Sequence, residues 1–255
     1  MNTCKNILAV VVGTTSLTLL PAAIPINDTP KYSSTQVASY LGAVAEARID
    51  FGFVNPRRNS RVRKTEGAGA RGCQRLGNAY LALLAPDDRA GLTTSPRPTF
   101  TWYVENVASV PMQFTLVELG VSKPVLLKKF NLPKPGIIEL EMPSNAPTLK
   151  LNKQYRWTVT LICNERRPSE NVYARAAIQR VATNLDEQLK NANSDLLRAK
   201  VYADASILYD AMASAAKAYL ANPREKASSE YFFQLLEQVG LSKVASKEQQ
   251  RLASQ

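Results

Sequence analysis

The sequence predicts an α+β protein in which an all-β antiparallel sandwich is followed by a C-terminal α-helical hairpin. Short runs of alternating apolar and polar residues, separated by Pro, Gly and Asn, fill residues 79–181. After residue 181, apolar residues recur at three- and four-residue steps, which is the period of an amphipathic helix. With 45% hydrophobic and 21% charged residues among 255, the composition is that of a folded protein with one or two domains.

Residues 1–23 have the pattern of an export signal. Lys5 precedes an apolar run from Ile7 to Leu20, and residues 21–23 (Pro-Ala-Ala) supply small side chains for cleavage. A membrane-spanning helix needs roughly 20 apolar residues, so this run is short for an anchor. Because Pro21 is a poor residue for the cleavage site, an uncleaved N-terminal anchor is the alternative. We expect a periplasmic or extracellular protein with no membrane span after the signal.

Residues 24–72 are predicted to form a flexible basic linker, with a short strand at 48–54. In residues 56–75 seven basic residues face one acidic residue, which accounts for +6 of the net charge of +11. The candidate contacts for an anionic partner are Arg57, Arg58, Arg61, Arg63, Lys64, Arg71 and Arg75. The alternative is a solvated linker. Nucleic acid is not an expected partner, because the chain carries an export signal and no aromatic residues alternate with these arginines.

Cleavage of the signal removes Cys4 and leaves Cys73 and Cys163, which are 90 residues apart. In an oxidising compartment an even number of cysteines predicts a disulfide. Closing a loop of this length would stabilise the fold by about 4 to 5 kcal/mol in the chain-entropy model. Two buried thiols are the alternative reading of the same residues.

Residues 73–181 are predicted to form the sandwich. The seven expected strands are Ala79–Ala85, Thr99–Glu105, Met112–Leu119, Val125–Asn131, Ile137–Met142, Gln154–Cys163 and Val172–Val181. Alternation places Phe100, Trp102 and Val104 on one face of the second strand. Tyr155 and Trp157 share one face of the sixth strand. We expect these two faces to form the core, with the tryptophans buried there and not stacking on sugars.

Residues 182–245 are predicted to form the helical hairpin and residues 246–255 a tail. The first hairpin helix covers residues 194–221 and stops at Asn222-Pro223. The second covers Lys226–Val239, and Gly240 stands where a left-handed C-terminal cap belongs. A weaker helical segment is expected at residues 184–193.

The chain contains no histidine, which excludes Ser-His-Asp and Cys-His catalysis and histidine-ligated metals. Glu139 and Glu141 share one strand face about 6.5 to 7 Å apart, a spacing found in inverting glycosidases, but we expect them to point into solvent. Asp87, Asp88 and Asp210 are isolated acids expected in turns and on a helix surface. No catalytic, cofactor-binding or metal-binding residue and no cofactor is predicted.

Residues 149–157 resemble the segment before the sixth strand of fibronectin type III and immunoglobulin-like sandwiches. In those domains a tyrosine hydroxyl bonds nearby backbone to make a tyrosine corner, and Tyr155 occupies that position here.

A longer series of landmarks resembles the cyanobacterial family called domain of unknown function 928. In order they are Arg71–Cys73, Gly91–Trp102, Phe114–Glu118, Gly136–Ile138, Leu151–Trp157 with Cys163-Asn164, Ile178–Arg180, Tyr202-Ala203, Ile207–Ala211 and Leu235–Leu241. The chain departs from the family at Tyr209 and at Phe232 or Phe233, where the family favours tryptophan. The resemblance implies an exported cyanobacterial protein with no assigned activity and no catalytic residue to carry over.

We therefore expect an exported, non-enzymatic protein of the cell envelope that acts as a protein-binding or adaptor module. Its contact surface would be the helical hairpin or a free sheet edge. The alternative is a binder of anionic envelope polysaccharide or peptidoglycan. The third hypothesis is a carboxylate-based glycoside hydrolase.

Overall fold

The computed structural model of the chain describes residues 80–105, 111–131 and 134–254. In this part there are eight strands, one 3-10 turn and five α-helices. The strands are β1 (Tyr80–Leu83), β2 (Gly91–Thr93), β3 (Thr99–Glu105), β4 (Pro111–Glu118), β5 (Pro124–Asn131), β6 (Gly136–Glu141), β7 (Gln154–Leu161) and β8 (Val172–Arg180). The other elements are η2 (Pro168–Glu170), α1 (Asp186–Asn191), α2 (Asp195–Asp204), α3 (Leu208–Ala221), α4 (Lys226–Gln238) and α5 (Ser242–Ala253).

The strands form two sheets. The small sheet has the order β1-β3-β6 and the large sheet the order β2-β8-β7-β4-β5. All neighbours are antiparallel except β2 and β8, which are parallel. The α+β class is confirmed, and each of the seven predicted strands is present with ends within two residues of those expected. The expectation of a purely antiparallel fold was wrong at β2, which has only three residues, too few for alternation to reveal.

The first core lies between the two sheets and contains the predicted aromatic residues. Trp102 and Trp157 are both 0% exposed, so the prediction that they are buried is confirmed. The ring of Phe100 lies 4.9 Å from that of Phe114 and 5.1 Å from that of Trp157, centroid to centroid. Tilted contacts at these distances are the favoured geometry for aromatic pairs, and they join the small sheet to the large one.

The predicted tyrosine corner is present at the start of β7. The backbone N–H of Lys150 donates to the Tyr155 hydroxyl over 2.9 Å. Within the same turn Asn152 has a positive φ of 58°, and its N–H donates to the carbonyl of Arg180. The turn is therefore fixed both to β7 and to the end of β8.

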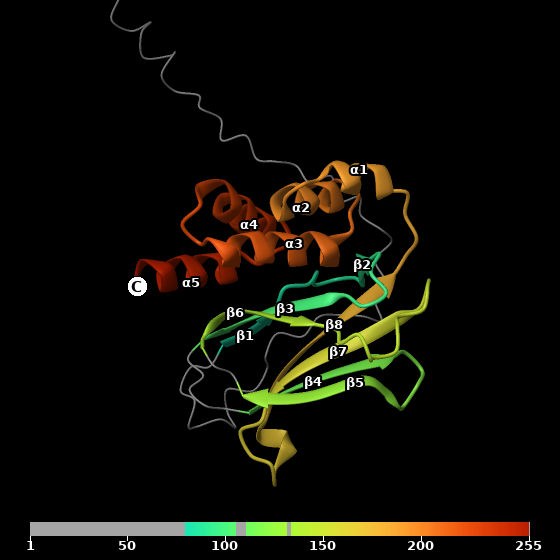
Figure 1. Cartoon of the computed structure of the whole chain (residues 1–255). Coiled ribbons are helices and arrows are strands. Elements are labelled where there is room, and N and C mark those ends of the chain that lie inside the picture. Colours follow the sequence, from blue (N-terminus) through green and yellow to red (C-terminus); the bar gives the residue numbers. More distant parts are fainter. Residues whose placement is uncertain (1–79, 106–110, 132–133, 255) are drawn as a thin grey trace, which may run out of the picture. The chain divides into compact units, whose positions relative to one another are not determined.

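The helices cover the other face of the small sheet (Figure 1). There Ala82, Tyr103 and Ile137 pack against the apolar faces of α2 to α5 and form a second core. The rings of Tyr219 and Phe232 stack within it at 4.8 Å. Strands β1 and β3 of the small sheet are thus buried on both faces, and the apolar side of the helices is directed into the protein.

The helical layer differs from the predicted hairpin in two places. The expected helix at 194–221 is two helices, because the chain turns at Ser206, whose φ is 61°. The expected tail at 246–255 lies mostly in α5, which buries only Val244, Ala245 and Glu248. Its narrow apolar stripe includes an acid, so the sequence pattern resembles that of a solvated segment. The left-handed cap at Gly240, with φ 83°, is as predicted.

Tyr209 of α3 anchors the helical layer in the first core. Its hydroxyl accepts a hydrogen bond from Trp157 Nε1 at 2.6 Å and donates to the carbonyl of Ala177 at 3.0 Å. A glycine is required opposite this ring, because a Cβ at Gly91 would lie 2.6 Å from Tyr209 Cε2. Burial raises the pKa of the Tyr209 hydroxyl, which keeps it protonated as a donor.

Asp210, expected on a helix surface, is buried in the first turn of α3. Its carboxylate accepts from the Thr93 hydroxyl at 2.6 Å, and from the Thr94 backbone N–H at 2.7 Å and hydroxyl at 2.6 Å. The prediction failed because these donors come from β2 and the residue after it, 116 and 117 positions away in the chain. Asp210 therefore ties the short parallel strand to the helical layer.

A second buried acid joins α5 to α3. Glu248 is 0% exposed, accepts from the Tyr219 hydroxyl at 2.7 Å and forms a bidentate ion pair with Arg251 at 2.7 Å to both oxygens. Hydrogen bonding to Glu248 raises the pKa of Arg251, so its guanidinium group stays charged. A buried charge with its hydrogen bonds satisfied in this way fixes the position of the last helix.

Candidate functional site

The outer face of the large sheet carries the polar side chains that alternate with buried ones on β4, β7 and β8. This face is turned away from the helices (Figure 1). Strand register aligns Lys129, Gln113, Thr160 and Tyr173 in one row across β5, β4, β7 and β8. Because neighbouring strands lie about 4.8 Å apart, this row spans about 14 Å. Alternation that directs Met112, Phe114 and Trp157 into the first core directs these residues outward.

This row lines a groove of about 520 Å³, which we call the sheet groove. The residues that line it are Gln113, Lys129, Thr158, Thr160, Ile162, Glu165, Pro168, Asn171, Tyr173 and Arg175. Hydroxyl and amide groups predominate, and the charged members are one lysine, one arginine and one glutamate. Such a lining offers both donors and acceptors, with an excess of positive charge.

Arg175 is held in this groove by the neighbouring aromatic ring. Its guanidinium carbon lies 4.5 Å from the ring centroid of Tyr173, a cation-π contact that orients the planar group. Its Nε is buried and has no hydrogen-bond partner within the described part of the chain. Buried donors are nearly always paired in folded proteins, so an unpaired one in a polar groove indicates a place for an acceptor.

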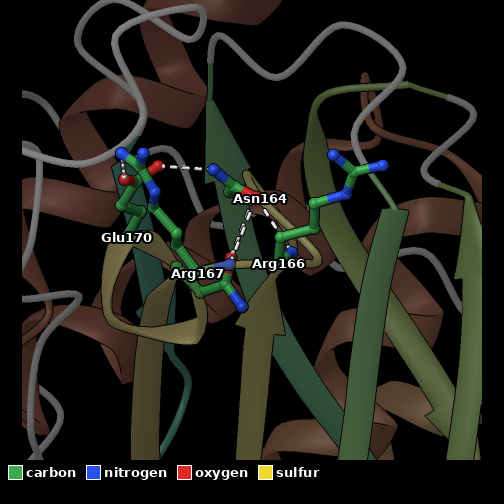
Figure 2. A network of polar contacts seen from close by, with 5 residues as sticks. Asn164, Arg166, Arg167 and Glu170 are labelled. Carbon is green, nitrogen blue, oxygen red and sulfur yellow. Dashed lines mark hydrogen bonds and ion pairs between the residues drawn. The ribbon is translucent and has the colours of Figure 1, made fainter.

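The segment between β7 and β8 forms one wall of the groove. Figure 2 shows the side chain of Asn164 between the backbone of Arg166 and Arg167 on one side and Glu170 on the other. Its Oδ1 accepts from the N–H of Arg166 at 2.9 Å and of Arg167 at 3.2 Å, and its Nδ2 donates to Glu170 at 2.9 Å. Arg167 completes the network with an ion pair to Glu170 at 3.0 Å. The hydrogen bond from Asn164, followed by that from Arg167, lowers the pKa of Glu170.

Asn171 joins this wall to the sheet. Its Oδ1 accepts from the backbone N–H of Cys163 at 2.9 Å and of Asn164 at 3.1 Å. These bonds help to hold Glu165 and Pro168 at the rim of the groove. Cys163 therefore lies at the base of the wall, and its predicted disulfide stays a prediction because Cys73 falls outside the described residues.

A second cavity, of about 670 Å³, lies between the β1–β2 connection, the α2–α3 turn and the end of α4. Asp87, Asp88 and Asp204 line it together with Arg89. Asp87 and Asp88 lie in bends of a loop, as predicted. Across the described ranges, no group of three or more acidic or cysteine side chains is arranged to hold a metal ion.

Glu139 and Glu141 lie on the face of β6 that is turned toward the helices. Both are exposed, as expected, yet neither lines either cavity. Partial burial raises the pKa of Glu139 to about 7, with Lys217 opposing the shift and Asp195 adding to it. An ion pair of 3.2 Å between Lys217 and Asp195 stands beside this carboxyl group.

The predicted anionic contacts at Arg57, Arg58, Arg61, Arg63, Lys64, Arg71 and Arg75 lie outside the described residues, as do the signal and the strand at 48–54. Among the helices that the structure describes, none has the length and apolar character needed to cross a membrane.

The sheet groove was not predicted from the sequence, although part of its signal is visible there. Thr158, Thr160, Tyr173 and Arg175 occupy the polar positions of two alternating strands. That alternation predicts an outward face but not which strands lie side by side. The contribution of Gln113 and Lys129 depends on the pairing of β4 with both β7 and β5.

Comparison with known proteins places the chain in a family. No curated protein matches it. Residues 66–249 match the family described as Domain of Unknown Function (DUF928), a range that includes both sheets and almost the whole helical layer. The chain therefore belongs to the DUF928 family.

Proposed function

We propose that this protein is an exported, non-enzymatic binding module of the cell envelope, and that its ligand is an anionic envelope polysaccharide or peptidoglycan bound in the sheet groove. The observation that carries the proposal is the lining of that groove, where hydroxyl and amide side chains surround Lys129 and Arg175. Sugars present many hydroxyl groups, which need both donors and acceptors, and acidic sugars also need a cation.

The position of the groove supports the same function. Its floor is a paired sheet and its wall is fixed by the Asn164 network, so the lining side chains stand on rigid backbone. A site whose groups are already in place loses less conformational entropy when a ligand binds. The predicted basic segment at 56–75 would add a second, less specific attraction for the same anionic polymer.

Protein binding is the second candidate, and one observation favours it. Leu119, Val121 and Leu127, on and beside the β4–β5 hairpin, are 39%, 47% and 53% exposed. The C-terminal helices are less suited to protein binding than we expected, because their apolar faces form the second core. A protein partner would therefore dock on the β4–β5 hairpin, and the triple change to serine should abolish its binding.

The test of glycan binding uses the purified full chain with intact peptidoglycan and, separately, with acidic envelope polysaccharide. Thr160→Glu places a carboxylate in the middle of the groove and should abolish the specific binding. The matched control is Arg156→Ala, which removes a positive charge from the same strand and sheet face but lies outside the groove lining. Because the contact is partly electrostatic, affinity should fall as salt rises.

Equal binding by Thr160→Glu and the unchanged chain would show that the groove is not the site. If binding is then lost on replacing Arg57, Arg58, Arg61 and Arg63 by serine, the basic segment is the contact. The hydrolase hypothesis requires glycan cleavage that disappears in the Glu139→Gln, Glu141→Gln double variant.

We also infer that the two sheets are a fibronectin type III-like sandwich. The pairing of β1-β3-β6 opposite β8-β7-β4-β5 and the tyrosine corner at Tyr155 support this relation. Many such domains serve as binding modules, although fold alone does not assign a ligand.

A further inference from the structure

We propose that Arg175, stacked on Tyr173, is the receptor for a carboxylate group, so that the sheet groove selects carboxylated sugars over sulfated and neutral ones. This inference rests on the function proposed above and names the chemical class of the ligand. Two kinds of ligand share this carboxylate group. One is an acidic polysaccharide that contains sugar acids, and the other is peptidoglycan, whose sugar and peptide parts carry carboxylates.

The guanidinium group of Arg175 has a shape that matches a carboxylate. A guanidinium group presents a planar fork of N–H donors that matches the two oxygens of a carboxylate. Contact with the Tyr173 ring at 4.5 Å holds that plane in one orientation. The ring face is then occupied by Arg175 itself, so Tyr173 serves to orient the guanidinium.

The Nε atom of Arg175 is a donor that needs an acceptor. Within the described chain this buried atom has no hydrogen-bond acceptor, which is an unfavourable state for a donor on a charged group. A carboxylate that draws the guanidinium slightly outward would supply the missing acceptor. The free protein thus holds a donor that becomes satisfied only when an anion is present.

The remaining charges select the type of anion. Lys129 and Arg175 carry two positive charges, and Glu165 at the rim carries one negative charge. Glu165 repels a densely charged sulfated polymer, whereas a sugar hydroxyl can donate to it. Thr158, Thr160 and Gln113 suit further hydroxyl groups. One carboxylate among many hydroxyls fits this pattern better than clustered sulfates.

The experiment compares four probes by calorimetry with the full chain: polygalacturonate, its carboxyl-reduced neutral form, dextran sulfate and peptidoglycan. Arg175→Lys keeps the charge but removes the planar fork. It should weaken binding of polygalacturonate by about tenfold to a hundredfold, the range expected for a lost charge-assisted hydrogen bond. Arg156→Lys, on the same face, should stay within about twofold because exposed charges contribute little. Thermal unfolding checks that both variants are folded.

Carboxylate selection predicts tight binding of polygalacturonate or peptidoglycan, weak binding of the reduced polymer, and loss of the difference in Arg175→Lys. Binding of polygalacturonate would identify an acidic polysaccharide as the source of the carboxylate, and binding of peptidoglycan would identify peptidoglycan. If the reduced polymer binds equally well and Thr160→Glu still abolishes binding, the carboxylate inference is wrong while the proposed function stands. If dextran sulfate binds most tightly and Arg175→Lys has no effect, the inference is also wrong. If none of the glycans binds, both fail.

Discussion

Tyr209→Phe tests whether the helices and the sheets form one cooperative unit. The change removes a single oxygen atom that accepts from Trp157 Nε1 and donates to the carbonyl of Ala177. Both partners are buried, at 0% and 1% exposure, so water cannot replace the hydroxyl. Leaving the indole N–H unpaired costs about 1 to 3 kcal/mol. With the second bond also lost, we expect the free energy of unfolding to fall by about 2 to 3 kcal/mol.

The measurement is urea denaturation followed by far-ultraviolet circular dichroism and by tryptophan fluorescence. Both probes should give one shared transition, because Trp157 lies in the first core and the helices dominate the dichroism. A loss of this size corresponds to a fall in Tm of about 4 to 12 °C for a domain of this length. Tyr173→Phe, on the outer sheet face, is the control and should change stability by less than about 0.5 kcal/mol.

Two results would refute the reasoning. If Tyr209→Phe is as stable as the control, the hydroxyl does not link α3 to the sheets. If dichroism and fluorescence give different urea midpoints even in the unchanged chain, the helical layer unfolds independently. The contacts of Tyr209 then contribute little to the cooperativity of unfolding.

Three further predictions concern stability. Gly91→Ala should destabilise the fold by about 1 to 3 kcal/mol, because its Cβ would lie 2.6 Å from the Tyr209 ring. Tyr209→Ala should relieve this clash. Urea midpoints of the two single variants and the double variant then measure the coupling energy between positions 91 and 209. Glu139 has its pKa raised from 4.5 to about 7, so the folded state holds a proton that the unfolded state releases and stability should fall as pH rises through this window. Glu139→Gln should flatten that fall in denaturation curves at several pH values; an unchanged slope would show that another group is responsible. Titration of denatured, unreduced mature protein should find no free thiol, and Cys73→Ser or Cys163→Ser should lower stability by about 4 to 5 kcal/mol if the disulfide forms.

The strands were predictable because their pattern has a local cause. A strand with one face in a core must alternate, so β4 and β7 could be found from their own residues. The tyrosine corner was predictable for the same reason, since its hydrogen bond spans only five residues. β2 has three residues and is defined by its parallel partner β8, which its own sequence does not reveal.

The helical layer was predicted less well where buried polar groups replace apolar ones. α5 turns Glu248 inward, and a glutamate gives no apolar signal even though Tyr219 and Arg251 pair with it. Asp210 was misplaced for the same reason. The break at Ser206 was also hidden, because no glycine or proline marks that turn.

The candidate site depended most on three-dimensional pairing. Tyr173 and Arg175 lie two residues apart on one strand, so their contact follows from alternation. Their association with Gln113 and Lys129 requires the order of β5, β4, β7 and β8. No residue of this groove forms a recognisable motif by itself. The arginines of residues 56–75, which cluster in the sequence, were therefore predicted as the anionic contact instead.

The two cores impose an order on folding during synthesis. The first core is incomplete until Tyr209 has left the ribosome, and the second cannot close until Glu248 and Arg251 of α5 have followed. A nascent chain that stops short of its last helix therefore exposes one side of the small sheet and cannot reach its stable state. If the chain is exported in the unfolded state, as the proposed function requires, folding that is completed only after the last helix has been made would keep the chain competent for transport.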